Sequence, residues 1–588
     1  MDNKIIAGYL NDFKKDFGLE EENESKLFEM FANYCVISRI HPEAFSTNFE
    51  KIESMNLGGG DDTGIDGLGI IVNESLASSI DEIDDLKNFR RRLDVQFIFI
   101  QAKTSPKFDA SKIGTFIFGV KDFFREESTI RFNDNIKEFK ELKDHIYSNS
   151  IDFEVKPTCQ MYYVTTGKWV GDKTLLGRAD SDKADLEKLG IFSSVEFVPI
   201  DADSIGNIYR DLKNKVKKQI IFEKRASIPP IKGVREAYIG ILPISEYLKL
   251  ISDSDGKMQK NLFYDNVRDF LGQNSVNNEI ANTIKQKEEQ GKFAILNNGV
   301  TIVANNIHPI GDTFTISDFQ IVNGCQTSHV LFNNKEYLKN SKASIPIKLI
   351  VTEDYEVANQ ITKATNRQTE VKVEAFASLE PYHRKLEEHF NSYPIENRIY
   401  YARRSNQYNN VVPSIPKERV ITLSAQINAF ISTFLNEPHS THRYYGELLK
   451  AYQGKLFQPD HNPEMYYVSS FALHTIEKII KGRLPLIERF FKENKFKHHF
   501  LMVLRIIVCG NTHPSFASKK MTNYCEKLYS VLIRPRGTAS AIEDTSVIIR
   551  NAVSNYEIKY GKTNHRELHR KRNFTSLLIT EAEKFVQR

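Results

Sequence analysis

The pattern of hydrophobic and polar positions divides the chain into three parts. Residues 1–222 alternate between the two periodicities: "ESKLFEMFANYCVIS" has apolar residues at helical spacing, whereas "DVQFIFIQAK" and "CQMYYVTTG" are short apolar runs typical of buried strands. This order predicts a mixed sheet flanked by helices. A second α/β block, with strands in "AILNNGVTIVA", "FQIVNGCQT" and "PIKLIVTE", reaches about residue 400, and the rest is mostly helical.

An α/β multidomain organisation is therefore expected, because 588 residues exceed what one hydrophobic core usually serves. The stretch "EKRASIPPIKGVRE" carries a Pro-Pro pair and little periodicity, which favours a linker at 223–236. The expected domains are 1–222, 237–400 and a helical, basic region at 401–588. No apolar run is long enough to cross a bilayer and the start lacks the apolar core of a signal peptide, so we expect a cytoplasmic protein without membrane contact.

The charge and cysteine content narrow the classes of function. Five scattered cysteines without a Cys-x-x-Cys pair argue against a disulfide framework and a cysteine zinc site. The net charge of +4 hides an uneven distribution: residues 1–100 hold 20 Asp/Glu and 10 Lys/Arg, whereas residues 501–588 hold 7 Asp/Glu and 15 Lys/Arg. A basic C-terminal region suits a polyanion such as nucleic acid, although a solvated helical surface explains it equally well.

Two polar side chains interrupt the apolar strand in "DVQFIFIQAKTS". Because side chains alternate between the two faces of a strand, Gln101 and Lys103 project from the same face where the strand leaves the core. Burial of these groups without a partner would be costly, so a polar partner is expected to face them.

The upstream stretch "GGGDDTGIDGLGIIVN" supplies that partner. Its glycines permit tight turns, and Asp66 stands at the start of the strand expected in "GLGIIVN". A carboxylate and an amide oxygen are hard ligands suited to Mg²⁺, and a lysine can offset charge on a phosphate. Glu29, on the apolar side of the first long helix, is the fourth candidate. Asp61 and Asp62 remain alternative ligands, and capping of the turn is the simpler interpretation of both.

The order of Glu29 on a helix, Asp66 in a Gly-rich turn and Gln101 and Lys103 on a strand resembles the PD-(D/E)XK nuclease fold, in particular the Mrr-type restriction endonucleases, which have Gln in place of an acidic residue. The resemblance implies phosphodiester cleavage with Mg²⁺ or Mn²⁺. Asp66 and Gln101 would bind the metal, Glu29 would hold a metal-bound water or a second metal, and Lys103 would position the nucleophile. The acidic segment "ESLASSIDEIDDLKNFRRRLD" separates Asp66 from Gln101 and is interpreted as a hairpin insertion.

The middle block resembles the abortive-infection phage-resistance (AIPR) proteins through "YDNVRDFLGQNSVNNEIANTI", "FAILNNGVTIVA", "FQIVNGCQTSHVLF" and "ITKATNRQTEVKVEAF". Amides read hydrogen-bonding edges and Arg reads phosphate, so the block is a candidate nucleic-acid or nucleotide site. Equally, these amides would cap turns and pair with one another. The candidate residues are Arg268, Asn297, Asn298, Asn323, Gly324, Gln326, Asn366 and Arg367.

Two classes of function remain open on the sequence alone. The first is a metal-dependent endonuclease of anti-phage defence that acts on DNA rather than RNA, as a homodimer if it follows the nucleases it resembles, with a phage-derived trigger. The second is a non-catalytic or cryptic sensor of nucleic acid or a phage component. In either case the basic tail is expected to contact phosphates through Arg566, Arg570, Lys571 and Arg572, unless it is only a solvated helix face.

Overall fold

The computed structural model covers the 588-residue chain and forms two compact units. The first unit comprises Met1–Cys35, Ala44–Gly206 and Ser378–Arg588, and the second comprises Val36–Glu43 and Asn207–Ala377. The described residues are all those outside 1–2, 20–21, 43, 46–50, 59–62, 91, 214–215, 254–255, 264–274, 340, 367–380, 404–406, 409–414, 482–495, 562–564 and 588.

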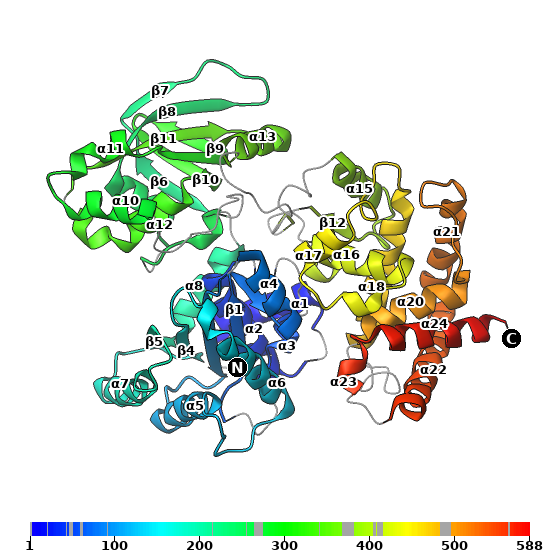
Figure 1. Ribbon diagram of the computed structural model, residues 1–588. Helices are drawn as coiled ribbons and strands as arrows, with labels where there is room; N and C mark the ends of the chain where they lie inside the picture. The colour runs from blue at the N-terminus through cyan, green and yellow to red at the C-terminus, as the bar shows by residue number, and fades with distance from the viewer. Residues whose placement is uncertain are drawn as a thin grey trace. The chain divides into compact units, whose positions relative to one another are not determined.

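The N-terminal part of the first unit is built on a mixed five-stranded sheet in the order β2-β1-β3-β4-β5 (Figure 1). The central strand β3 pairs antiparallel with β1 and parallel with β4, which in turn pairs parallel with β5. The strands are β1 (Gly67–Val72), β2 (Ser75–Ala77), β3 (Val95–Lys103), β4 (Thr158–Thr165) and β5 (Ser194–Ile200). The associated helices are α1 (Lys4–Phe17), α2 (Glu24–Ile40), α3 (Lys51–Ser54), α5 (Ala110–Phe123), α6 (Asp134–Ser148), α7 (Lys173–Glu187) and α8 (Ala202–Lys213). The parts of α2 after Cys35 and of α8 after Gly206 belong to the second unit.

The apolar run of β3 explains why the strand is buried on both faces. Because successive side chains alternate between faces, Phe97 and Phe99 lie on one face and Ile98 and Ile100 on the other. Both phenylalanine rings pack against Phe124, at centroid distances of 5.1 Å for Phe97 and 5.7 Å for Phe99. Phe99 also contacts Phe123 of α5. Apolar residues of α5 and α6 belong to the same core. The last residues of β3 on this face are Gln101 and Lys103, so the alternation carries them to the end of the strand.

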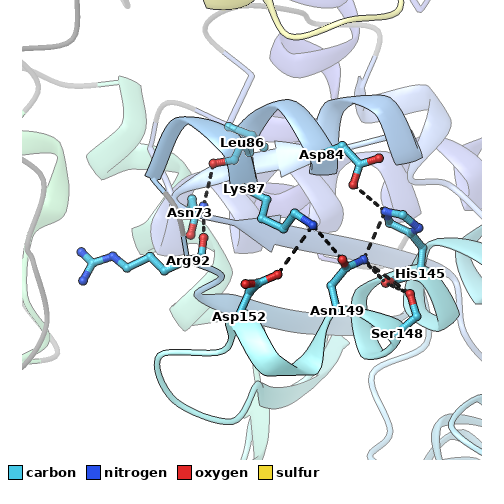
Figure 2. Close-up of polar contacts among 9 residues, drawn as sticks. All are labelled: Asn73, Asp84, Leu86, Lys87, Arg92, His145, Ser148, Asn149 and Asp152. Carbon is cyan, nitrogen blue, oxygen red and sulfur yellow. Dashed lines mark hydrogen bonds and ion pairs between the residues drawn. The ribbon is translucent and has the colours of Figure 1, made fainter.

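The acidic insertion between Asp66 and Gln101 forms a short strand and a helix. Asn73 and Glu74 both have positive φ and make the two-residue turn between β1 and β2. The chain then forms α4 (Ile80–Arg90). Figure 2 shows how this helix is held: the buried Asn73 amide donates to the backbone oxygens of Leu86 and Arg92, at 3.0 and 2.9 Å. The expected hairpin is thus present, and a helix extends it.

The other contacts of α4 join it to two further parts of the first unit. Toward α6, Lys87 donates to Asn149 at 2.7 Å, and His145 lies 2.8 Å from Asp84 (Figure 2). Toward the C-terminal region, Asp85 accepts from the Arg443 guanidinium at 2.8 Å and from the backbone N–H of Tyr444 at 3.1 Å. The carboxylates on α4 are therefore used as internal ion-pair partners.

The C-terminal part of the first unit is almost entirely helical, as expected (Figure 1). The elements are α15 (Pro381–Asn391), β12 (Tyr400–Ala402), β13 (Val420–Thr422), α16 (Leu423–Phe434), α17 (Tyr445–Ala451), α18 (Pro463–Lys481), α20 (Lys497–Cys509), α21 (Lys520–Leu532), α22 (Pro535–Tyr560), α23 (His565–Leu568) and α24 (Arg572–Val586). The deeply buried Arg505 of α20 donates to the backbone oxygens of Thr433, Gly510 and Asn511, which ties the end of α16 to the loop that follows α20.

The second unit contains a six-stranded sheet in the order β6-β10-β9-β11-β8-β7, in which only β9 and β11 run parallel. Its strands are β6 (Lys217–Ile221), β7 (Lys224–Ser227), β8 (Glu236–Pro243), β9 (Val300–Ile310), β10 (Thr313–Asn323) and β11 (Ser344–Val351). The helices are α9 (Ile244–Ile251), α10 (Ser275–Lys285), α11 (Phe293–Leu296), α12 (Cys325–Asn333) and α13 (Tyr355–Asn366). The mixed α/β fold class with a helical C-terminal region is confirmed.

The structure differs from the expected boundary at residues 223–236. Residues Lys224–Ser227 form β7, which pairs antiparallel with β8, so the Pro-Pro pair marks the loop of a hairpin where a linker was expected. The preceding strand β6 also belongs to the second sheet, so the first domain does not extend to residue 222. Within the described residues, no helix is long and apolar enough to cross a membrane.

Candidate active site

Asp66, Gln101 and Lys103 meet at one end of the N-terminal sheet. Gly67 is the register partner of Ile100 in the antiparallel pair of β1 and β3, and the Asp66 backbone N–H donates to the Ile100 oxygen at 2.9 Å. This register places Asp66 opposite Gln101. Asp66 and Gln101 are both 3% exposed, and the Lys103 side chain is 26% exposed. The three residues therefore form a polar group that is buried at its base and open to solvent at the lysine.

The Asp66 carboxylate is held firmly. Its Oδ2 accepts from the backbone N–H of Ala102 at 2.8 Å and from the Lys103 ammonium at 3.1 Å. The Asp66 backbone oxygen accepts from Leu57 at 3.0 Å. A carboxylate fixed through both backbone and side chain lies in one position relative to Gln101, which a preorganised site requires.

The Gly-rich turn packs directly against the site. Gly64 has φ +79°, and a Cβ at this position would lie 2.4 Å from Nε2 of Gln101. A Cβ at Gly58 would lie 2.6 Å from Oε2 of Glu29. Glycine is therefore favoured at Gly64 by its positive φ, and a side chain at either glycine would displace the polar group beside it. Glu29 is half-buried on α2, as its place on the apolar side of the helix predicts. Asp61 and Asp62, the alternative ligands, lie outside the described residues.

Two further polar residues, Asn33 and Tyr163, approach the site, and the sequence analysis had selected neither of them. Asn33 follows Glu29 by one turn of α2, is fully buried, and has neither side-chain atom in a hydrogen bond. A Cβ at Gly67 would lie 2.0 Å from its Oδ1. Tyr163 of β4 is the register partner of Gln101. Burial, together with the charges of Asp109 and Asp66, raises the pKa of its phenol to about 12, so it stays a proton donor at neutral pH.

The donor set fits a hard divalent cation. The buried Oε1 of Gln101 has no hydrogen-bond partner, although an amide oxygen in this environment normally has one. A cation between this oxygen and the Asp66 carboxylate would satisfy it, and oxygen ligands of this kind suit Mg²⁺ or Mn²⁺. Among the described residues no three His, Cys, Asp or Glu side chains are close enough to hold a metal by themselves. The amide oxygen is therefore an essential part of the candidate site.

The amides of the middle block are engaged within their own unit. Asn297 accepts from the Gly299 N–H at 3.1 Å, Asn323 donates to the Thr365 oxygen at 2.7 Å, and Gln326 accepts from Asn277 at 2.9 Å. Gly324, with φ 102°, begins α12 at the end of β10. Asn298 is exposed. These contacts match the structural interpretation of the amides. Arg268 and Arg367 lie outside the described residues, as does the side chain of Asn366.

The basic residues of the tail differ in their contacts. Arg570 forms ion pairs with Asp81 of α4 at 3.4 Å and with Glu567 at 3.8 Å, so an internal carboxylate occupies it. The Lys571 ammonium lies over the Tyr556 ring, 5.9 Å from its centroid. Arg572 is exposed. The Arg566 side chain lies outside the described residues. The exposed Arg572 is thus better placed than Arg570 to meet a phosphate.

Comparison with known proteins gives one match. The family model described as AIPR protein matches residues 263–566, which is just over half of the chain and includes the middle motifs and most of the helical region. No curated protein and no solved structure matches the chain significantly. The N-terminal site lies outside the matched range, so its chemistry rests on its own geometry. The match, extending over the amide-bearing strands and the helical part, shows that the chain belongs to the AIPR family, the abortive-infection phage-resistance proteins.

Proposed function

We propose that this AIPR protein is a metal-dependent endonuclease whose N-terminal domain hydrolyses phosphodiester bonds, in DNA rather than RNA, during phage defence. The observation that carries the proposal is the convergence of Asp66, Gln101 and Lys103 at the end of two paired strands, with a buried amide oxygen lacking a partner beside a fixed carboxylate. The order of Glu29, Asp66, Gln101 and Lys103 along the chain, on which the resemblance to PD-(D/E)XK nucleases rests, supports the same proposal.

Each residue has a role that follows from its position. Asp66 and Gln101 would hold Mg²⁺, which supplies Lewis-acid chemistry toward a phosphate and lowers the pKa of water. The Lys103 ammonium lies 3.1 Å from Oδ2 of Asp66 and is partly exposed, so it can reach from the site toward an incoming phosphate. There it orients the attacking water and offsets the charge that builds on the phosphoryl oxygens. Glu29, beside the turn at Gly58, is positioned to accept a proton from that water or to hold a second cation.

The bond changes are those of hydrolysis. The oxygen of water forms a bond to phosphorus, the bond from phosphorus to the sugar oxygen breaks, and the sugar oxygen leaves as a hydroxyl after it takes up a proton.

The charge distribution suggests that different parts of the chain cleave and bind the nucleic acid. The first 100 residues carry 20 Asp/Glu and 10 Lys/Arg, so nucleic acid has to be held by other parts of the chain, and the last 88 residues carry the largest excess of basic groups noted above.

The test is cleavage of supercoiled plasmid by the full-length protein with Mg²⁺ or Mn²⁺, for wild type, Asp66→Ala and Lys103→Ala. Lys121→Ala is a matched control, because Lys121 lies in the same domain, is 28% exposed compared with 26% for Lys103, and pairs with a carboxylate at 2.9 Å. We expect nicking by wild type and Lys121→Ala only. Equal nicking by all four proteins, or by none of them in the presence of phage components, would rule out this assignment and favour a sensor.

A further inference from the structure

Two loops leave the N-terminal sheet at the edge that carries Asp66, Gln101 and Lys103. The first, residues 104–109, follows β3, and the second, residues 166–172, follows β4. The two strands are parallel, and Lys103 is the register partner of Thr165, so both loops begin at the same level of the sheet. These edge loops are therefore the part of the chain that an incoming substrate strand meets beside the candidate active site.

The edge loops are fixed against each other and against the sheet. A Cβ at Gly167 would lie 1.8 Å from the backbone oxygen of Pro106, so the second loop touches the backbone of the first. The Trp169 N–H donates to Oδ2 of Asp201 at 3.1 Å, and the Ala202 N–H donates to the Gly167 oxygen at 2.8 Å, which ties the second loop to the end of β5. A surface held in this way loses little conformational entropy when a ligand binds.

An aromatic row runs from the active site along these loops to the solvent. Tyr163 is the register partner of Gln101, and its ring centroid lies 5.9 Å from that of Phe108. The Phe108 ring lies 4.7 Å from the Trp169 ring, at an interplanar angle of 62°. Phe108 and Trp169 pack against the core and are only half-buried, and the next residue, Val170, is 81% exposed. Accessible aromatic side chains beside a positively charged surface are the platforms on which proteins stack unpaired bases.

Lysines surround the aromatic row. Residues 103–112 and 166–173 hold five lysines and two aspartates, whereas the first 100 residues are strongly acidic. Lys107 and Lys168 are exposed and flank Phe108 and Trp169 in the sequence. Both aspartates accept hydrogen bonds from backbone N–H groups at the starts of α5 and α7, where they cap the helices. The edge of the sheet is therefore locally basic and suited to phosphates.

From this arrangement we propose that the edge loops bind a single DNA strand, with an unpaired base stacked on Phe108 and Trp169 and phosphates on Lys107 and Lys168. In a closed duplex the faces of each base are covered by its neighbours, so only an unpaired base offers its face to an aromatic side chain. The substrate is accordingly a single strand, or a duplex that has opened locally. The inference rests on the proposed nuclease function, because it assigns the substrate of that site.

The chain contains one tryptophan, Trp169, so tryptophan fluorescence reports on this surface directly. The experiment is titration of the full-length protein, in buffer with EDTA, with three DNA ligands: an oligothymidine, an abasic strand of the same length, and a dumbbell duplex whose end loops carry no bases. We expect saturable quenching by the oligothymidine and weaker or no quenching by the other two at equal occupancy. Because EDTA prevents metal-dependent cleavage, a failure of binding here is distinct from a failure of the plasmid cleavage assay.

Variants at Trp169 separate stacking from general attraction to DNA. With a fluorescently labelled oligothymidine, Trp169→Leu should weaken binding about tenfold, as expected for the loss of one base–aromatic stack. Trp169→Phe keeps an aromatic ring against the core and should restore most of the affinity. Urea unfolding of both variants checks that neither loses the folded state.

A lysine pair tests the phosphate contacts. The double variant Lys107→Ala and Lys168→Ala should reduce the slope of log binding constant against log salt concentration by about 1.4, from roughly 0.7 for each phosphate contact on a single strand. Lys188→Ala is the control, because Lys188 is 76% exposed, pairs with Asp185, and follows the far end of α7, roughly 20 Å from the edge loops. It should leave the slope unchanged.

Any of three results would overturn the proposal. The first is saturable DNA binding, or no DNA binding, without quenching of Trp169. The second is equal quenching by the oligothymidine and by either the abasic strand or the dumbbell duplex. The third is wild-type affinity for the oligothymidine in Trp169→Leu.

Discussion

The substitution Gly64→Ala tests whether the position of the Gln101 amide matters to the chemistry. A Cβ at Gly64 would lie 2.4 Å from Nε2 of Gln101, whereas ordinary van der Waals contact begins at 3.4 Å. The amide must therefore move by about 1 Å, and a displacement of that size at a reacting centre costs on the order of a hundredfold in rate. The φ of +79° adds roughly 1–2 kcal/mol of backbone strain for any residue other than glycine.

The control for this strain is Gly171→Ala. Gly171 lies in the same domain with φ +70°, and a Cβ there would meet no atom within 4 Å. Both variants should therefore lower the midpoint of urea unfolding, Gly64→Ala at least as much as Gly171→Ala, and both should remain folded. Single-turnover cleavage of a labelled DNA duplex with Mg²⁺ should fall about a hundredfold in Gly64→Ala only. If the two variants cleave at the same rate, the position of Gln101 has no part in catalysis and the reasoning fails.

Three further predictions concern charge and protonation. Lys103→Ala should reduce cleavage by about a hundredfold or more but keep cation binding, because it removes a positive charge 3.1 Å from Asp66; calorimetry with Mn²⁺ that shows lost binding would contradict this role. Burial, assisted by the charge of Arg403, lowers the pKa of His383 to about 3. In the unfolded chain the pKa of His383 is near 6.5, so at pH 5 this histidine is protonated in the unfolded state and neutral in the folded state. The free energy of unfolding should therefore fall by about 2 kcal/mol from pH 8 to pH 5 because of this residue. Urea unfolding of wild type and His383→Gln at both pH values measures the difference, and an identical pH dependence in the two proteins would refute it. Arg572→Ala should reduce the slope of log binding constant against log salt concentration for duplex DNA by about 0.9. Arg570→Ala, which breaks an ion pair with Asp81, should lower the free energy of unfolding and change this slope little. Gel-shift titrations at several salt concentrations measure the slopes, and equal slopes in wild type and Arg572→Ala would show that the tail does not contact DNA.

The sequence predicted the central group of the site because strand periodicity is strict. Gln101 and Lys103 must share a face of the strand, because side chains alternate. The Gly-rich turn leads directly into the neighbouring strand, so Asp66 is expected at the start of that strand. Asn33 and Tyr163 were not predicted, because each stands in an apolar run where a buried amide or phenol has the same pattern as a core residue. The signal for Asn33 was present: a polar side chain on the buried stripe of a helix, one turn after Glu29.

The boundary between the first two domains was harder to predict for a similar reason. "KNKVKKQI" continues the helical pattern of α8, but residues Lys217–Ile221 form the edge strand β6. Edge strands tolerate lysine because it discourages further pairing, so helix and strand share this composition. The short run "AILNN" was likewise ambiguous: its first residues belong to α11, and β9 begins at Val300. In both cases the choice between helix and strand depends on pairing with strands distant in the sequence, which a local sequence pattern does not show.

The central claim is that Asp66 and Gln101 form a cation site, and binding of Mn²⁺ measures it most directly. Calorimetric titration of the full-length wild-type protein should show saturable binding, and Asp66→Asn should abolish it. Asp122→Asn is the control, because Asp122 is an equally buried carboxylate of the same domain whose oxygens accept from Thr129. Mn²⁺ binding that survives in Asp66→Asn, or that is absent from wild type, would contradict the account.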